Sequence, residues 1–394
     1  MLGFATFAAL LPQLRDAWSL TNAQAGTVGG MFFVGYVASV SVWTTLTDRG
    51  DGRKIYAAGS VAAAAGSAGF ALFARGFVSA ICFQALLGIG IGGTYMPGLR
   101  LLSDRVTGPK QSRAIAFYTA SFGVGTALSL ALAGAIASRL GWRAAFLVAA
   151  AGPIVAGMLV LAFLAPLRVA RPSHPVALVP FKSWGPILRK REALAYIAGY
   201  AVHCLELFGS RSWMVAFLTF SAAVQGLQRA FPFSAQTIAA VVNLLAVPAS
   251  VLGNEAAIRV GRRRWILLAM AASGSSGILL GFSAPWHWAI VSALLAAYSM
   301  LVMADSATLT AGLVAAAPPE LRGSAMGVYS LAGFGGGMLG PMVFGAALDA
   351  AGGASRPLAW VAGYVSIGAG CLAAPLVARV AVAQPRSGSP PERR

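Results

Sequence analysis

Long runs of apolar residues, separated by short polar segments, repeat along the whole chain. A helix needs about 20 predominantly apolar residues to cross the hydrocarbon core of a bilayer. Eleven runs predict membrane-spanning helices, at 24–46, 55–74, 77–99, 114–138, 144–166, 193–221, 235–258, 265–283, 286–316, 323–348 and 358–382. The segment 1–14 is equally apolar but too short to span at about 1.5 Å per residue. It predicts the C-terminal part of a twelfth helix.

The short first run also carries an expectation about the start of the protein. A complete first span would need about one to two dozen further residues before Met1. We therefore expect an all-α membrane protein of twelve helices, with the first helix truncated in this sequence.

A polar segment interrupts the apolar pattern near the middle of the chain. It contains four prolines and six basic residues, which predicts a linker rather than a span. The halves on either side are similar, because the run that starts at Arg113 has an echo at Gly323. Parallel repeats of six helices are a transporter architecture. The predicted parts are a first six-helix bundle, a cytoplasmic linker, a second six-helix bundle and a cytoplasmic tail, at 1–166, 167–192, 193–383 and 384–394.

Composition supports a membrane protein, and charge predicts its orientation. The chain is 58% hydrophobic and 10% charged, whereas soluble domains carry about 25% charged residues. The net charge of +18 comes from Lys and Arg in alternate loops, not from a basic stripe interleaved with aromatics, which argues against nucleic-acid binding. Because Lys and Arg favour cytoplasmic loops, we expect a multi-pass protein of the bacterial inner membrane with both termini in the cytoplasm.

Several motifs resemble the major facilitator superfamily. The loop after the second span reads TDRGDGRK at 47–54. It is similar to the family's loop signature, an Asp-Arg followed by Gly and a basic pair, with one extra residue before that pair. The runs TYMPGLRLLSDR (94–105), HCLELFGSRSW (203–213) and MADSATLTAGL (303–313) extend the resemblance to essentially the whole chain. It implies a prokaryotic secondary transporter, expected as a monomer, whose two bundles rock about a midplane site.

The resemblance also implies gating roles for charged residues in the loops. By analogy, Asp48 would face the N-terminus of the helix that begins near Gly323, where a carboxylate is stabilised by about 0.3–1 kcal/mol. Other loop charges would form inter-helix pairs that break as the bundles rock, namely Arg49, Arg53 and Lys54 in the first half and Glu255 with Arg262 in the second. The plainer alternative is that the basic residues anchor the loops at the membrane surface.

Four ionisable residues lie well inside predicted spans, away from the span ends, where charge is costly and usually marks function. His203 and Glu206 are three residues apart and share a helical face, so together they are candidates to carry a proton. Arg211 lies on a different face, and its fork of donors can hold an anionic substrate. A static polar network is the alternative for these three. Asp305 is expected to pair with a group on the helix of Arg211, to contact substrate, or to cap local backbone.

The function we expect is secondary transport of a small solute, driven by protons, rather than catalysis. The sequence holds no nucleotide-binding motif and no metal-ligand spacing, so we expect no cofactor. Its three histidines are well separated, which argues against a catalytic cluster. Arg211 favours a small organic or inorganic anion. Drug efflux by proton antiport stays open, although Gln84 stands where many such antiporters of the superfamily carry Arg, four residues before Gly88. A non-transporting membrane sensor is the remote alternative.

Overall fold

The computed structural model describes residues 1–106, 108–166, 184–226, 233–318 and 321–382; within these ranges the side chains of Asp48, Pro109, Ser112, Ala116 and 375–382 are not described. The described residues form helices joined by short loops, and no strand occurs among them. In chain order the helices are α1 (Thr6–Ala17), α2 (Asn22–Arg49), α3 (Gly52–Phe73), α4 (Phe77–Ser103), α5 (Pro109–Phe163), α6 (Trp184–Leu188), α7 (Arg191–Val224), α8 (Ala235–Val260), α9 (Arg262–Phe282), α10 (Trp288–Met303), α11 (Ser306–Ala316), α12 (Arg322–Ala350) and α13 (Pro357–Val382).

The predicted spans correspond to these helices, and the expected all-α membrane fold is confirmed. Two predicted spans, 114–138 and 144–166, run together as α5 and are separated by a break at Gly141, whose φ of 82° suits glycine. The span predicted at 286–316 is not one continuous helix. It is α10 followed by α11, with a turn at Ala304 and Asp305 between them.

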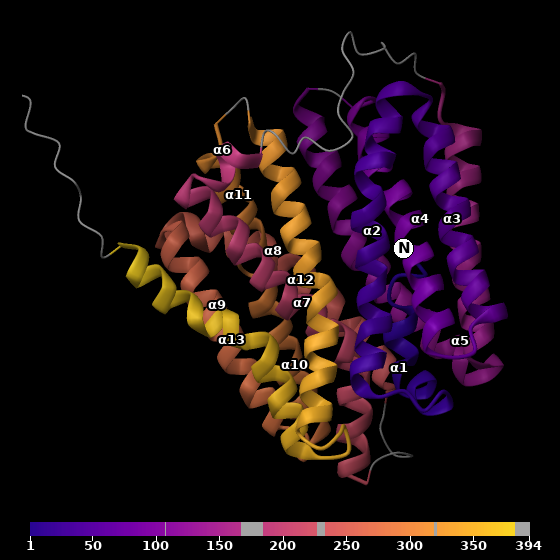
Figure 1. The fold of residues 1–394 in the computed structure, drawn as a ribbon, viewed down its shortest axis with the longest axis vertical. Coiled ribbons are helices and arrows are strands. Elements are labelled where there is room, and N and C mark those ends of the chain that lie inside the picture. The colour runs from indigo at the N-terminus through magenta and orange to yellow at the C-terminus, as the bar shows by residue number, and fades with distance from the viewer. Residues whose placement is uncertain (107, 167–183, 227–232, 319–320, 383–394) are drawn as a thin grey trace, which may run out of the picture.

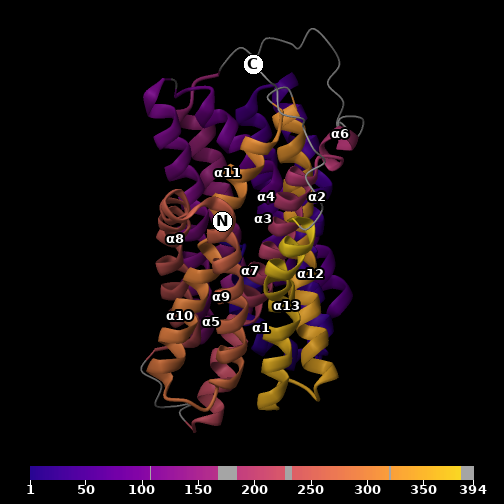
Figure 2. The same cartoon turned by 90° about the vertical axis from the view of Figure 1, so that its left-hand side faces the viewer.

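The helices gather in two groups that follow the order of the chain. Figure 1 shows α1–α5 on one side of the molecule and α7–α13 on the other, with α6 at the end where α7 begins. Figure 2 shows most of the long helices running along the vertical axis of the molecule. The predicted tail at 384–394 and residues 167–183 of the predicted linker lie outside the described residues, so the division at 167–192 stays a prediction.

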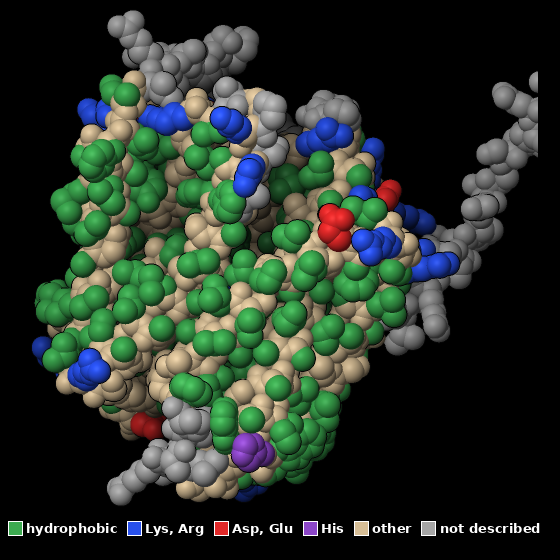
Figure 3. Space-filling model, turned by 180° about the vertical axis from the view of Figure 1, so that it is seen from behind, with side chains coloured by type: hydrophobic (Ala, Val, Ile, Leu, Met, Phe, Trp, Pro, Cys, Tyr) green, Lys and Arg blue, Asp and Glu red, His purple; other side chains and the backbone are tan. Residues whose placement is uncertain are grey.

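The outer surface of the helices is apolar, as contact with lipid requires. Figure 3 shows a broad band of hydrophobic side chains, with Lys and Arg gathered toward one end. Large side chains that face outward include Val78, Leu140, Phe163, Ile258 and Leu358. A soluble monomer rarely exposes so extensive an apolar surface. Among the described residues, ten helical segments are long and apolar enough to cross a membrane, with α5 counted once, and the chain is a multi-pass membrane protein.

Helices α2 and α12 join the two groups, and glycine lets their backbones touch. A Cβ added at Gly26 would overlap the carbonyl oxygen of Pro341, and one added at Gly345 would overlap that of Asn22. Small residues permit this close approach between helices in a membrane. The two helices meet near these contacts, and Figure 1 shows them diverging toward the end of the molecule that carries α6.

A methyl group at this contact should loosen the joint between the groups. We expect Gly345→Ala to lower the thermal unfolding temperature of the detergent-purified protein, because overpacking costs about 1–3 kcal/mol. Gly335→Ala, on the same helix, is the matched control: a Cβ there meets nothing within 4 Å, and alanine favours the helix over glycine. Unfolding temperatures that fall equally in both variants would contradict this account.

Candidate functional site

A cavity lies between the two groups of helices, with about 40 Å³ of enclosed space and about 510 Å³ when the space open to solvent is counted. It is lined by residues of α1, α2, α4 and α5 from one group and of α7 and α8 from the other. Five phenylalanines make up much of its wall, namely Phe4, Phe7, Phe32, Phe33 and Phe208. Phe33 of α2 and Phe208 of α7 meet across the two groups, with ring centroids 4.5 Å apart. The cavity is therefore apolar, aromatic and shared by both halves, as expected of a small-molecule site.

Arg211 is the charged side chain of this cavity. No other charged residue occurs among the described residues that line it. Phe208 precedes Arg211 by three residues, so both lie on the cavity face of α7. The guanidinium contacts the thioether of Met303, with Nη2 3.6 Å from Sδ, and no ion pair joins it to a carboxylate within the described part of the chain. Its fork of donors is therefore available to a bound anion.

Two buried amides, Gln84 of α4 and Asn243 of α8, also line the cavity. Each has an amide atom that finds no hydrogen-bond partner in the described structure, Nε2 of Gln84 and Oδ1 of Asn243. Such orphaned polar atoms are rare in protein interiors and call for an explanation. Together with Arg211, they make the polar part of a mostly aromatic site.

The His203 side chain does not line the cavity but pairs with Asp305. Nδ1 of His203 lies 2.7 Å from Oδ1 of Asp305, and both side chains are buried. The contact is close enough for an ion pair, although its direction does not make an aligned hydrogen bond. Asp305 sits at the turn between α10 and α11 and forms no side-chain cap to that helix. Of the expectations for Asp305, the structure shows pairing with a group on α7.

Glu206 faces a third direction, toward α9 and α13. Ser273 of α9 donates a 2.8 Å hydrogen bond to its Oε2. Its Oε1 lies beside Gly368 of α13 and has no hydrogen-bond partner among the described residues. Its side chain is 1% exposed, which removes it from both the cavity and the lipid face. His203, Glu206 and Arg211 thus point from one helix to three different environments, and the structure does not bring them together as one cluster.

The loop between α2 and α3 forms a local pair instead of the expected inter-helix one. Asp51 caps the N-terminus of α3 and binds Arg53, with Nη2 2.7 Å from Oδ2. This hydrogen bond holds the pKa of Asp51 below its usual value. Arg53 also donates to the carbonyl oxygen of Leu164 at the end of α5, within the same half. The side chain of Asp48 lies outside what the structure describes, so its predicted role stays a prediction.

The expected ion pair of the second half, between Glu255 and Arg262, does not form in the described structure. Lys54 and Arg49 are exposed at the adjoining ends of α2 and α3. Glu255 and Arg262 are exposed on α8 and α9, and no ion pair joins them in the described structure. The conformation seen here therefore shows no Glu255–Arg262 pair that a rocking motion would break.

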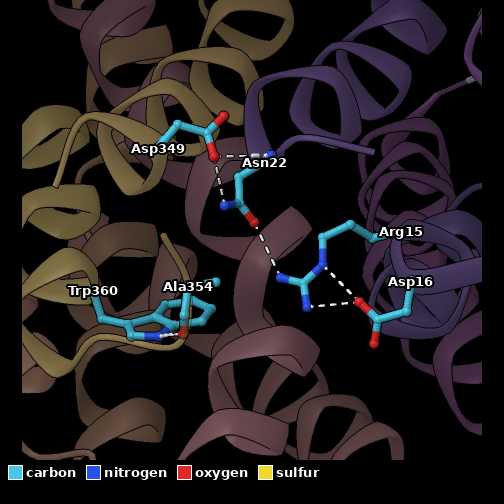
Figure 4. Close-up of polar contacts among 6 residues, drawn as sticks. All are labelled: Arg15, Asp16, Asn22, Asp349, Ala354 and Trp360. Atoms are coloured by element: carbon cyan, nitrogen blue, oxygen red, sulfur yellow. Dashed lines mark hydrogen bonds and ion pairs between the residues drawn. The ribbon is translucent and has the colours of Figure 1, made fainter. Parts of the chain in front are cut away.

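An inter-helix contact that the sequence did not indicate lies at the opposite end of the molecule. Asp349, near the end of α12, accepts hydrogen bonds from the backbone N–H groups of Asn22 and Ala23 at the start of α2, at 3.2 and 2.8 Å. It also accepts one from the side-chain amide of Asn22 at 2.7 Å, and Arg15 donates to the same side chain (Figure 4). We call the hydrogen bonds of Asp349 with Asn22 and Ala23 the α2–α12 latch.

The latch completes the N-terminus of α2. The first backbone N–H groups of a helix have no partner within it and attract negative charge. Thr21 and Gln24 form a capping box that satisfies the Gln24 N–H, and Asp349 satisfies the two before it. A carboxylate of the second half therefore helps to cap the N-terminus of a helix of the first half.

Sequence reasoning missed several residues of the cavity and of the latch. The cavity phenylalanines lie in apolar runs where lipid-facing and cavity-facing rings look alike. Asn243 was detectable as a polar residue inside a predicted span, where such residues are costly. Phe208 was detectable by its spacing from Arg211. Asp349 gave no signal, because a carboxylate near a helix end is ordinary until its partner is known.

A multi-pass helical protein whose cavity is lined by helices of both halves has the architecture of a solute transporter. The family model of the Major Facilitator Superfamily matches residues 1–234. The chain belongs to the Major Facilitator Superfamily, a family of membrane transporters.

Known proteins of related sequence are named as transporters of small organic solutes. The chain is 27% identical over 146 residues, 36% of its length, to a probable 4-methylmuconolactone transporter of Cupriavidus pinatubonensis. It is 26% identical over 34% of its length to organic cation/carnitine transporter 7 of Arabidopsis thaliana, and 23% identical over 35% to a niacin transporter of Acinetobacter baylyi. These matches span 33%, 26% and 31% of the relatives' own lengths.

The fold is also that of a solved transporter. A bacterial homolog of the human lysosomal transporter Spinster, in an inward-facing and unoccupied conformation, superposes with a TM-score of 0.71. The match covers 97% of this chain and 93% of that one, at 16% sequence identity. At this identity the likeness shows the fold alone.

The latch makes a prediction about access to the cavity. Asp349→Asn offers one acceptor oxygen instead of two and removes the charge that the α2 N-terminus favours. A loss of about 1–2 kcal/mol would raise the population open on the Asn22 side roughly five- to thirtyfold. The readout is labelling of Ser212→Cys, in a Cys82→Ser background, by a membrane-impermeant thiol reagent added on that side of oriented proteoliposomes.

The control for this experiment is Asp16→Asn. Asp16 is a comparably placed carboxylate whose side chain is 69% exposed, and it pairs with Arg15 inside the first half (Figure 4). Labelling should be unchanged in that variant. Equal labelling rates in Asp349→Asn and the unaltered protein would show that the latch does not hold this side closed.

Proposed function

We propose that this transporter carries a small organic anion whose carboxylate binds Arg211. The observation that carries the proposal is a guanidinium lining the cavity with no carboxylate paired to it among the described residues. Withdrawing a charge from water is costly unless it is paired. A substrate carboxylate would supply that pair through two parallel hydrogen bonds, the geometry for which arginine is best suited.

The body of the substrate in this proposal is apolar and carries a ring. The five phenylalanines of the cavity favour flat, apolar groups, because aromatic rings stack or meet edge to face. Two relatives are named for 4-methylmuconolactone and niacin, which are both small ring compounds with one carboxylate. The relative named for organic cations and carnitine would favour a cationic substrate, but Arg211 would repel a bare cation.

Proton coupling is the drive we propose, with the buried groups of α7 as carriers. The His203–Asp305 pair and Glu206 are ionisable, deeply buried and set apart from the cavity wall. Ionisable groups at membrane depth often belong to proton relays. Because α7 also carries Arg211, a change of protonation at Glu206 and a change of occupancy in the cavity act on the same helix. Substrate and proton would then be coupled through α7 and not by competing for one site.

Alternating access is the mechanism that accompanies this proposal. In this proposal the latch and the glycine contacts, which join α2 and α12 near the Asn22 end, close the cavity at that end. We assign the opposite end, where the loop at 47–54 lies, to the cytoplasm of a bacterial cell, since basic residues favour that side. The transporter would work as a monomer in the inner membrane, with both termini in the cytoplasm. We still propose that the charged loop residues act as gates, through contacts that form in the conformation open at the Asn22 end. These residues are Asp48, Arg49, Arg53, Lys54, Glu255 and Arg262.

Two other functions remain as outcomes of the test. Efflux of amphipathic drugs would use the phenylalanines of the cavity without needing Arg211. A membrane sensor would bind a ligand without moving it. Binding of drugs but not of carboxylates would support the first, and binding without uptake would support the second.

Substitution of Arg211 tests the anion site directly. Thermal-shift screening of the purified protein against small ring monocarboxylates and drugs identifies ligands, and a pH gradient across proteoliposomes then drives uptake of each hit. Arg211→Gln should weaken carboxylate binding at least tenfold, because a hydrogen-bonded charge pair is worth about 1.5–3 kcal/mol. The exposed Arg139→Gln is the matched control. Carboxylate uptake that survives Arg211→Gln unchanged would end the proposal.

Substitution of Glu206 tests proton coupling separately from binding. Glu206→Gln can still accept a hydrogen bond from Ser273 but cannot gain or lose a proton. We expect ligand binding in detergent to persist and accumulation driven by a pH gradient to fall to the level of passive exchange. Ser273→Ala removes the hydrogen bond but leaves the carboxyl group, so it should retain coupling. Undiminished accumulation in Glu206→Gln would exclude Glu206 as the carrier.

A further inference from the structure

Asn243 offers the cavity a hydrogen-bond acceptor whose direction is fixed. Its Nδ2 donates to the carbonyl oxygen of Ala239 at 2.8 Å and lies 3.6 Å from the thioether of Met214. Both of those groups only accept hydrogen bonds. The amide nitrogen must therefore face them, and the oxygen must face away, so the usual ambiguity between the two ends of an amide does not arise here.

The oxygen of this amide has no protein partner. Asn243 is 2% exposed, and Oδ1 is buried without a hydrogen bond among the described residues. A buried acceptor without a partner costs free energy. Because Asn243 belongs to the wall of the cavity together with Arg211, a molecule in the cavity is in position to satisfy it.

The other polar residues of the cavity cannot select a donor in the same way. Ser212 carries a hydroxyl, which donates or accepts as needed. Thr126 donates to the carbonyl of Phe122 and keeps free lone pairs on an oxygen that can also rotate. No hydrogen bond in the described structure fixes the amide of Gln84, so it can present either end. Asn243 is the residue of this wall whose amide is held in one orientation, and it presents an acceptor.

We propose that Asn243 determines specificity by accepting a hydrogen bond from the substrate. This rests on the proposed function, in which Arg211 binds the carboxylate. The substrate class is then narrower than a ring monocarboxylate: its apolar body also carries a hydroxyl or N–H donor. A site built around a fixed polar group rejects analogues that lack the matching group, because the protein atom is left unpaired.

Matched ligands test this proposal. The probes are benzoate, 3- and 4-hydroxybenzoate, and the corresponding methoxybenzoates, whose ether oxygen accepts but cannot donate. Dissociation constants are measured on the detergent-purified full chain. One hydroxybenzoate should bind at least tenfold more tightly than its methoxy counterpart, since a tenfold change corresponds to about 1.4 kcal/mol. Asn243→Leu should reduce this ratio to near one, while weak binding of benzoate persists.

The controls distinguish the proposed role of Asn243 from the proposed binding of a carboxylate by Arg211. Asn254→Leu makes the same change on the same helix outside the cavity wall, and it should leave the ratio unchanged. Unfolding temperatures of both variants report whether they fold. A ratio near one in the unaltered protein, or a ratio that survives Asn243→Leu, overturns the role of Asn243 while Arg211-dependent binding still supports the proposed function. If no carboxylate binds and Arg211→Gln changes nothing, both proposals fail.

Discussion

Backbone contact between α2 and α12 at Gly26 and Pro341 fixes the geometry on which the site depends. No larger residue than glycine fits at this crossing. The same Pro341 carbonyl accepts a 3.0 Å hydrogen bond from Nε1 of Trp213, which is fully buried on α7. Helices α2, α7 and α12 therefore meet at one point. Because Phe208 and Arg211 lie within two turns of Trp213, that point also sets where the aromatic wall and the cation of the cavity face each other.

The transmembrane architecture was largely predictable because it follows from one strong constraint. Lipid requires long apolar helices with all backbone groups paired internally, and such runs are visible without knowledge of the fold. The break between α10 and α11 was not predictable. The run 286–316 is mostly apolar, its only ionisable side chains of Asp, Glu, Lys, Arg or His type are Asp305 and His287, and it contains no proline. The turn coincides with the pairing of Asp305 with His203. Tertiary contacts of this kind produce no periodic pattern in the amino-acid sequence.

The candidate site was predictable in its charges but not in its partners. His203, Glu206 and Arg211 were found because charge inside a span is rarely accidental. Three residues correspond to about 300° of rotation on a helix, so His203 and Glu206 lie about 60° apart, and that suffices for α7 to direct them to different neighbours. In the loop, Arg53 binds Asp51 because ordering a contact between near neighbours costs less chain entropy than a distant one. Family resemblance favoured the distant partner.

The strength of the latch depends on the salt concentration of the solution at the Asn22 end. Its strength comes from a carboxylate facing the positive end of a helix, at an end of the molecule where Asp16 and the adjoining loop are open to solvent. Such charge–dipole interactions are screened by dissolved ions, and the Debye length shortens from about 30 Å at 0.01 M to about 10 Å at 0.1 M salt. In the proposed alternating-access mechanism, the balance between the two access states is thereby tied to ionic strength on one face of the membrane. A cell moving from dilute to saline surroundings would find its carrier resting in the closed state less often, with no change in substrate or pH.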